Sequence, residues 1–415
     1  MDGLTGGVAA WSHNELIGQL EPKTNPNIRD MMKGQQLLRF PEGMVSFGFY
    51  DAGPGYTPAS WTKWHQFYAY SGDNDRPDWM GKLADRYDDI RSAPFANFVL
   101  PGAHDSGMNT NRYFGNIDSE TLKGMLAIAK AVGDIAASSI VRLITNLAIT
   151  QKDSFRSMLD MGTRFFDFRP GYAPWTVRQA PVFRDNIFHQ HSGIPGARFD
   201  EFLHDVTAWL SDHPGEIVVL NLNFDGFGND SLSNTMKPSM DTINEAVWSA
   251  CQRHDIGIGS IRDAAKTYQQ LIDDNVRLLM FNGSGFGSNH HASKNDSYFE
   301  HGDNEKRFGR KVVMETLRRM EPDSKGDYTL LQLQGTASGA LSVPDYIQLA
   351  GRSSDASSPL MMTKANVDAA TYPWVRENAI KFRTDRPLVI LNDFVDPVMA
   401  HIAEDVTLQR MRKTK

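Results

Sequence analysis

The sequence contains one cysteine, Cys251, so the chain can form neither an internal disulfide nor a thiolate cluster for a metal ion. It also lacks a run of about 18 uncharged apolar residues, the length that would span a membrane. Its most apolar stretch, residues 125–149, is interrupted by Lys130, Asp134 and Arg142. This stretch therefore predicts buried or lid-forming helices and no transmembrane segment.

Positive charge is scarce as well. The chain has 43 Lys and Arg against 50 Asp and Glu, a formal net charge of -7, and its isoelectric point is about 5.9. This balance excludes a broad nucleic-acid-binding surface. The one basic cluster, residues 410–415 within a predicted tail over residues 404–415, is interpreted as a solvated terminus. Residues 1–20 contain no signal-peptide pattern, which favours a cytoplasmic protein, or a secreted one if a preceding segment has been removed.

The 415 residues are 40% hydrophobic and 22% charged, which is typical of a folded globular protein. Residues 1–93 are rich in Gly, Pro and aromatic side chains, and they predict a β-rich region packed on the rest of the chain. The aromatic residues, interpreted as the core of a small sheet, are Phe47, Phe49, Tyr50, Tyr56, Trp61, Trp64, Phe67, Tyr68 and Tyr70.

From residue 97 onward, short apolar runs alternate with helical segments such as residues 199–211, a pattern of βα units around a parallel sheet. The sequence therefore predicts an α/β fold, an irregular (β/α) TIM-type barrel over residues 94–403 with a helical insertion at residues 108–152. The predicted strands are residues 97–100, 164–168, 186–191, 217–223, 276–281, 329–334 and 387–392.

Reactive side chains gather where four of these strands end. His104 and Asp105 follow the first strand, and period-two alternation places Asp167 and Arg169 on one side of the second. The other two ends carry His189 and His191, and Asp393. Active sites of barrels lie at the carboxyl ends of their strands. Imidazoles and an arginine that converge there can transfer protons on both sides of a phosphodiester and neutralise its charge.

In these residues the chain resembles the X-domain of phosphatidylinositol-specific phospholipase C and the related PLC-like phosphodiesterases. The resemblance covers about residues 95–400. It is carried in order by LPGAHDSG (100–107), RFFDFRP (164–170), the strand that closes at His191-Ser192-Gly193, DEFLHDVTAWLSDHPGEIVVLNL (200–222) and LVILNDF (388–394).

The resemblance implies a role for each reactive group. His104 resembles the general base that deprotonates the attacking hydroxyl, with Asp393 as its orienting carboxylate. His191 resembles the general acid for the departing alcohol, supported by Asp105. The Ser and Gly that follow it favour His191 over His189 in this role.

The second strand implies how the phosphate is held. Arg169 stands where metal-dependent relatives have a calcium-binding acid, and Asp167 resembles its acidic partner. An arginine at this position implies catalysis with no metal and no cofactor, in which the guanidinium binds the phosphate. The implied reaction is intramolecular attack that forms a cyclic phosphodiester, so the chain would be a phosphoric diester hydrolase or phosphorus-oxygen lyase, with a membrane lipid among its candidate substrates.

Substrate recognition departs from the family pattern. Asn223 stands where bacterial relatives bring a lysine to the inositol pocket, and the strand at residues 276–281 runs into Asn282-Gly283-Ser284-Gly285 without the arginine that the family pattern has there. Asn223, Asn282 and His189 are the predicted substrate-binding residues, and the sequence leaves open whether inositol is recognised. It also leaves open the leaving group and the oligomeric state.

Three alternatives remain from the residues alone. His189, His191 and Asp393 could bind a metal ion in a metal-dependent barrel hydrolase, although Arg169 would place a fixed positive charge beside it. The two-histidine site could serve another acid/base reaction. The barrel could also be catalytically silent and bind lipid or a partner.

Overall fold

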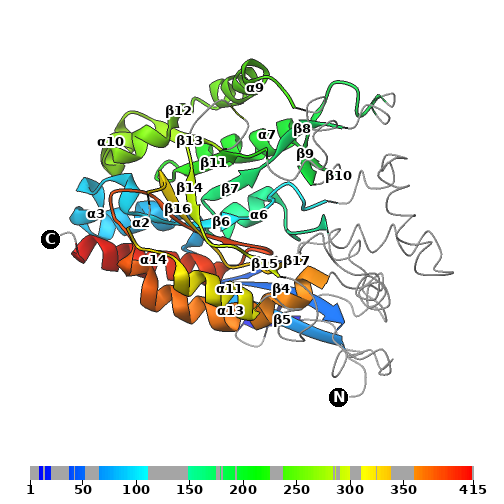
Figure 1. Ribbon diagram of the computed structural model, residues 1–415, viewed down its shortest axis with the longest axis vertical. Coiled ribbons are helices and arrows are strands. Elements are labelled where there is room, and N and C mark those ends of the chain that lie inside the picture. Colours follow the sequence, from blue (N-terminus) through cyan, green and yellow to red (C-terminus); the bar gives the residue numbers. More distant parts are fainter. Residues whose placement is uncertain are drawn as a thin grey trace.

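The computed structural model describes residues 9–12, 15–19, 37–41, 43–51, 65–110, 148–173, 178, 181–191, 194–224, 237–283, 286, 290–299, 310–323, 325–337 and 359–413. Its centre is a sheet of eight parallel strands in the order β12-β13-β11-β7-β6-β18-β16-β14 (Figure 1). In that order the strands span Gly257–Ser260, Val276–Asn282, Val218–Leu222, Phe165–Phe168, Val99–Ala103, Leu388–Asn392, Tyr328–Gln332 and Ala292–Lys294. The chain is thus an α/β protein, as its pattern predicts.

The sheet curls strongly. Tyr328 on β16 and Phe281 on β13 stand five strands apart, yet their ring centroids are 5.4 Å apart. The Tyr328 hydroxyl also donates a hydrogen bond to Asn221 Oδ1 on β11, at 3.1 Å. In a flat sheet, five strand spacings of about 4.8 Å would separate these residues by roughly 24 Å. Among the described residues no pairing joins the edge strands β12 and β14, so the curl remains an open half-barrel.

Residues along each strand alternate between two buried surfaces. The outward-facing side chains, such as Phe166, Val218 and Ile390, join one apolar core with helices α7 (Phe199–Asp212), α9 (Met240–Arg253) and α14 (Pro397–Lys413). The inward-facing ones, such as Phe165 and Val389, join another core inside the curl. Burial on both faces explains why these strands read as continuous apolar runs.

Inside the curl, side chains change from apolar to polar toward the carboxyl ends. On β7, Phe165 is followed two residues later by Asp167, and Arg169 comes directly after the strand. On β11, Val219 is followed by Asn221, and Asn223 comes directly after that strand. The period of two places all of these on the inner face. This change in polarity locates the candidate site.

Two edge strands of the parallel sheet are not among the predicted strands. Both β12 and β14 are short, and their residues are mostly half-exposed, so neither has the apolar run that marks a strand buried on both faces. The other six described strands of this sheet coincide with predicted runs.

The prediction that residues 186–191 form a strand of the barrel is wrong. The segment forms β9 (Ile187–His191), but it lies in a separate three-stranded antiparallel sheet between β8 (Pro170–Tyr172) and β10 (Ile194–Arg198). Only a few residues separate β9 from its neighbour β10. A parallel crossover needs a dozen or more, so this connection closes an antiparallel hairpin instead.

The N-terminal region contributes an antiparallel sheet of β3 (Leu37–Phe40), β4 (Gly43–Asp51) and β5 (His65–Gly72). It packs against α13 (Pro359–Asn378) and α14 on the outside of the parallel sheet (Figure 1). Phe47 is fully buried there. Helices α2 (Trp79–Arg86) and α3 (Asp88–Ser92) follow before β6. Tyr56, Trp61 and Trp64, and residues 111–147 of the predicted insertion, lie outside the described residues.

The prediction of a solvated basic tail over residues 404–415 is wrong as well. Helix α14 runs through the expected boundary at residue 404, and Arg410 in the basic cluster is fully buried. Its Nε donates to Asn97 O at 3.0 Å and its Nη2 to Arg383 O at 2.8 Å, so the cation caps backbone carbonyls instead of facing solvent. In the described part of the chain, no helix is both apolar enough and long enough to cross a bilayer.

The remaining described elements connect these layers or extend their edges. They are β1 (Ala9–Ser12), β2 (Glu15–Gln19), α6 (Phe155–Asp160), α10 (Tyr268–Asp273), β15 (Tyr298–Phe299), α11 (Arg310–Arg319) and β17 (Thr336–Ala337), with short 3-10 helices at Arg76–Asp78, Phe95–Asn97, Ile261–Ala265 and Ala379–Lys381.

Candidate active site

His104 continues the line of β6 past its carboxyl end. Its backbone N–H donates to Asn392 O at 3.1 Å, which extends the pairing of β6 with β18 by one step. The Gln151 side chain donates to the carbonyls of both residues and ties the two strand ends together. Across this junction, His104 Nδ1 lies 2.8 Å from Asp393 Oδ1. A buried carboxylate at this distance fixes the ring orientation and holds the proton on Nδ1, which leaves Nε2 for chemistry.

Asp105 lies at the centre of the site. Its φ of 42° is in the left-handed region, which Asp tolerates better than most residues, and the turn directs its side chain inward. The carboxylate contacts Arg169 Nε at 2.7 Å and Nε2 of three imidazoles, at 3.4 Å, 3.5 Å and 3.7 Å for His189, His104 and His191. One carboxylate thus contacts the predicted arginine and all three predicted histidines.

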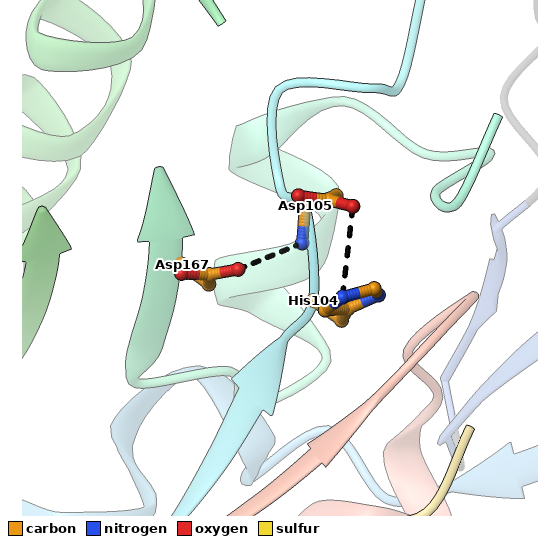
Figure 2. Close-up of side chains that lie close together, drawn as sticks. All are labelled: His104, Asp105 and Asp167. Atoms are coloured by element: carbon orange, nitrogen blue, oxygen red, sulfur yellow. Dashed lines mark hydrogen bonds and ion pairs between the residues drawn. The ribbon is translucent and has the colours of Figure 1, made fainter. Parts of the chain in front are cut away.

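Asp167 fills the other side of the same cluster, as Figure 2 shows for His104, Asp105 and Asp167. Its Oδ1 accepts hydrogen bonds from the amides of Asn221 and Asn223, at 3.1 Å and 3.2 Å. Its Oδ2 accepts from the Asp105 backbone N–H at 3.4 Å and lies 3.5 Å from an Arg169 nitrogen. Two side-chain amides, a backbone N–H and a guanidinium therefore surround the Asp167 carboxyl group.

The two histidines on β9 have different surroundings. His189 is fully buried, stands edge-on to the Phe168 ring, and accepts a hydrogen bond at Nδ1 from the Arg169 backbone at 3.2 Å. Its remaining proton is thereby placed on Nε2, facing Asp105. The His191 side chain is 25% exposed, and its Nδ1 has no hydrogen-bond partner among the described residues. Of the two, His191 has a ring that can reach a bound molecule.

The electrostatics of the site differ from group to group. Burial acts to lower the pKa of His104, but the Asp105 and Asp393 carboxylates outweigh it and the pKa is raised. Burial lowers the pKa of His189 and brings that of His191 to about 4. Burial also opposes ionisation of Asp105, yet Arg169 and the imidazoles hold its pKa well below the ordinary value. These pKa shifts favour the charged form of His104 and the neutral form of His191.

His104, Asp105 and Asp167 also form the one grouping of described residues with the spacing of a metal site, their ligand atoms lying within 4.8 Å of one another. The Arg169 guanidinium already contacts all three, including His104 Nε2 at 3.4 Å. A cation placed there would meet a fixed positive charge, so the residues fit a metal ion poorly. The alternative set of His189, His191 and Asp393 is not gathered into such a group, because Asp393 lies at the opposite nitrogen of His104 from Asp105.

A cavity of about 360 Å³ opens onto His104, Asp167 and Arg169. Of the three predicted substrate-binding residues, Asn223 lines the cavity, and Asn282 and His189 do not. The predicted general acid, His191, is not in the lining either. Residues 290–292 and 294–298 also line the cavity, and so do Tyr328, Leu330, Gln332 and Leu391.

Sequence reasoning missed several residues of the site. Asn221 has a visible signal, since it precedes Asn223 by two residues and so shares its face. Gln151 lies in the predicted insertion, and its bonds to two strand ends left no local pattern. The lining segment at residues 290–298 follows a Gly-rich loop, and its sequence predicts irregular chain.

Sequence comparison links part of the chain to known proteins, although no family profile matches it. It is 30% identical over 149 residues to mouse PI-PLC X domain-containing protein 3, covering 35% of this chain and 41% of that one. Mouse PI-PLC X domain-containing protein 2 is 26% identical over 146 residues, covering 35% and 38%, and human protein 1 is 25% identical over 158 residues, covering 38% and 45%. The chain thus spans less than half the length of these curated relatives.

Two solved structures are similar in outline. The phosphatidylinositol-specific phospholipase C from Listeria monocytogenes is 16% identical with a TM-score of 0.44, and a variant of the Staphylococcus aureus enzyme is 17% identical with a TM-score of 0.45. Each match covers 80% of this chain and 98% of the other. A likeness of this size does not establish an activity. The sequence match shows that about a third of this chain is similar to the PI-PLC X domain-containing proteins.

Proposed function

We propose that this protein cleaves phosphodiesters by two-histidine acid/base catalysis without a metal ion. The observation that carries the proposal is the juxtaposition of His104 Nε2 and the Arg169 guanidinium, 3.4 Å apart at the cavity, with Asp393 bound to the other nitrogen of His104. A base backed by a carboxylate and a planar cation for the phosphate are the two parts that such a reaction needs.

In the first step, His104 Nε2 removes the proton from a hydroxyl of the substrate, and that oxygen attacks phosphorus. Asp393 stabilises the imidazolium that forms, while Arg169 neutralises the phosphate oxygens. The bond from phosphorus to the leaving oxygen breaks, and His191 Nε2 supplies the proton that makes it an alcohol. A cyclic phosphodiester remains, and water can open it with the two histidines in exchanged roles. Because nucleophile and phosphorus belong to one molecule, proximity supplies much of the rate.

His191 must be protonated to act as the acid, whereas burial in the free site lowers its pKa to about 4. A bound phosphate anion acts in the opposite direction, since a nearby negative charge favours the imidazolium. Asp105, 3.7 Å from His191 Nε2, acts in the same direction. Substrate binding is therefore expected to move the shared proton from His104 toward His191.

The proposed substrate is a phosphatidylinositol-like or related phosphodiester. The cavity wall offers amides and hydroxyls, including Asn223, Asn295 and Ser297, and one lysine, Lys294, which suit a polar head group. Asn223 directs its amide to Asp167, so the head-group contact that a lysine makes in bacterial relatives must come from another residue here.

The test is phosphorus NMR of the purified protein with phosphatidylinositol, lysophospholipids and glycerophosphodiesters, first in EDTA and then with Ca²⁺, Mg²⁺ or Zn²⁺. A cyclic phosphate resonance in EDTA that His104→Ala abolishes is the expected result. Activity only after metal addition would replace the proposal with a metallohydrolase. Silence with every substrate would favour a different acid/base reaction or a lipid-binding or partner-binding role.

A further inference from the structure

A cluster of polar side chains, all buried except the half-buried Tyr70, lies behind β18, on the side of the sheet away from the cavity. It joins three parts of the chain that are distant in sequence: the N-terminal sheet, helix α13 and the end of β18. Its members are Tyr70, Lys364, Asp368, Tyr372, Asn392 and Asp396. Polar groups are this deeply buried only when their hydrogen bonds are made inside the protein.

Helix α13 supplies the centre of the cluster. Lys364, Asp368 and Tyr372 are four residues apart and so share one face of the helix. Lys364 Nζ lies 2.7 Å from Asp368 Oδ2 and 2.8 Å from Asp396 Oδ2. Burial opposes its charge, but the two carboxylates outweigh burial and raise the pKa of Lys364. The charged form of the lysine is therefore favoured between the two carboxyl groups.

Asp368 connects this centre to the N-terminal sheet and to β18. Its Oδ2 accepts a hydrogen bond from the Tyr70 hydroxyl on β5 at 2.6 Å. Its Oδ1 accepts one from Asn392 Nδ2 at 2.8 Å. Both bonds depend on one carboxylate, which the ion pair with Lys364 fixes in place.

Asn392 connects Asp368 to the candidate active site. With its amide nitrogen bound to Asp368, its Oδ1 points forward and accepts the backbone N–H of Asp393 at 2.9 Å. Asp393 in turn binds His104 Nδ1 at 2.8 Å. The next residue, Phe394, has a φ of 48°, so the chain turns sharply directly after Asp393. An unbroken series of hydrogen bonds thus runs from the N-terminal sheet to the candidate base.

We infer that Asp368 and Tyr70 are positioning residues that align Asp393 with His104, so that the N-terminal sheet supports the acid/base site. Neither residue touches the cavity, and both act through Asn392. The inference rests on the proposed function only in taking His104 as the base. The alignment itself is a property of the folded protein and can be measured without a substrate.

The test uses Tyr70→Phe and Asp368→Asn in the full chain, with Tyr268→Phe as the matched control. Tyr268 is a buried tyrosine whose hydroxyl donates to Gly215 O at 2.6 Å, and it contacts none of these groups. The first readout is proton NMR of the low-field Nδ1–H of His104 and the titration of its ring. The groups that face this ring are Asp393 at Nδ1, with Asp105 and Arg169 at Nε2. The second readout is kcat and KM on the best phosphodiester.

Both site variants are expected to shift or broaden the His104 resonance and to lower its pKa by about half a unit, because Asp393 then supports the imidazolium less well. We expect kcat to fall about tenfold with KM unchanged, the size of effect that an outer hydrogen-bond partner commonly has. Tyr268→Phe should change none of these values.

An unmoved His104 resonance and titration in both variants would overturn the inference, even if activity fell through a loss of stability. Tyr70→Phe removes one oxygen and keeps the ring, so this variant can still be measured if Asp368→Asn does not fold. If the wild-type protein cleaves no phosphodiester, the proposed function fails, but the NMR experiment still decides whether Tyr70 and Asp368 align the Asp393–His104 pair.

Discussion

Arg169 Nε lies 2.7 Å from Asp105 Oδ1, and this contact fixes the orientation of the guanidinium. With Nε bound to the carboxylate, an outer nitrogen lies 3.4 Å from His104 Nε2. The side chain is about one-tenth exposed, so its charge acts where water screens it little. Asp105 therefore directs a planar, permanently charged fork toward the place where the substrate phosphate would bind.

Replacing the Arg169 guanidinium by a single-point cation should largely abolish the proposed activity. In Arg169→Lys, the ammonium cannot keep the contact with Asp105 and bind a phosphate oxygen in the same geometry, so kcat is expected to fall about 10²- to 10³-fold. Steady-state kinetics would measure this. Arg156→Lys, at an exposed ion pair with Asp212, is the control and should keep full activity. If Arg169→Lys retains activity within about threefold, the guanidinium does not stabilise the transition state.

The two histidine roles can be separated by the leaving group. A general acid matters for a poor leaving group, such as an alkyl alcohol, and little for nitrophenol, which departs without a proton. His191→Ala should therefore lose about 10²- to 10⁴-fold on an alkyl ester and much less on the matching nitrophenyl ester, whereas His104→Ala should lose activity on both.

Rates on this pair of esters would provide the measurement, with the exposed His204→Ala as a control that changes neither. The opposite pattern would exchange the roles of His104 and His191. Equal losses on both esters in both variants would remove the general-acid assignment.

The alternation of side chains along the strands made most of this site predictable. A period of two was enough to place Asp167 with Arg169 inside the curl, and the apolar runs before them identified the strands. His104 and Asp393 lie close together for a different reason: β6 and β18 are parallel neighbours whose carboxyl ends coincide.

Other parts depend on pairings that one strand does not reveal. β9 has an apolar pattern like that of the sheet strands, and only its short link to β10 shows that it must pair antiparallel. The sequence predicts that Arg410 belongs to a solvated tail, because its partners, the carbonyls of Asn97 and Arg383, are far away in sequence. The link from Tyr70 to Asp368 spans almost 300 residues and has no local signal either.

The pH dependence of kcat/KM should be bell-shaped, because the proposed reaction needs one proton shared by His104 and His191. Below about pH 4, the pKa of His191, both rings are charged and no base remains. Above the pKa of His104, which lies higher than its ordinary 6.5, both are neutral and no acid remains. Activity should therefore rise through about pH 4 and fall again above pH 6.5.

Asp393→Asn tests the assignment of the alkaline limb. The Asp393 carboxylate raises the pKa of His104, so its loss should move that limb to lower pH as well as reduce the rate. The pH profiles of kcat/KM for both proteins would measure the shift. A limb that stays in place or moves upward would show that His104 does not control it.

Far from the cavity, Glu216 makes stability depend on pH. Its carboxylate is fully buried beside Arg164, at 2.7 Å, and burial raises its pKa from 4.5 to about 7. Between these values the folded protein binds a proton that the unfolded chain has released, so the free energy of unfolding falls as pH rises from 4.5 to 7, by about 3 kcal/mol. Glu216→Gln should flatten this dependence in denaturant titrations, whereas Glu315→Gln, on the exposed face of α11, should leave it unchanged. If the Glu216→Gln protein keeps the wild-type slope, the ion pair with Arg164 outweighs burial and holds Glu216 ionised throughout this range.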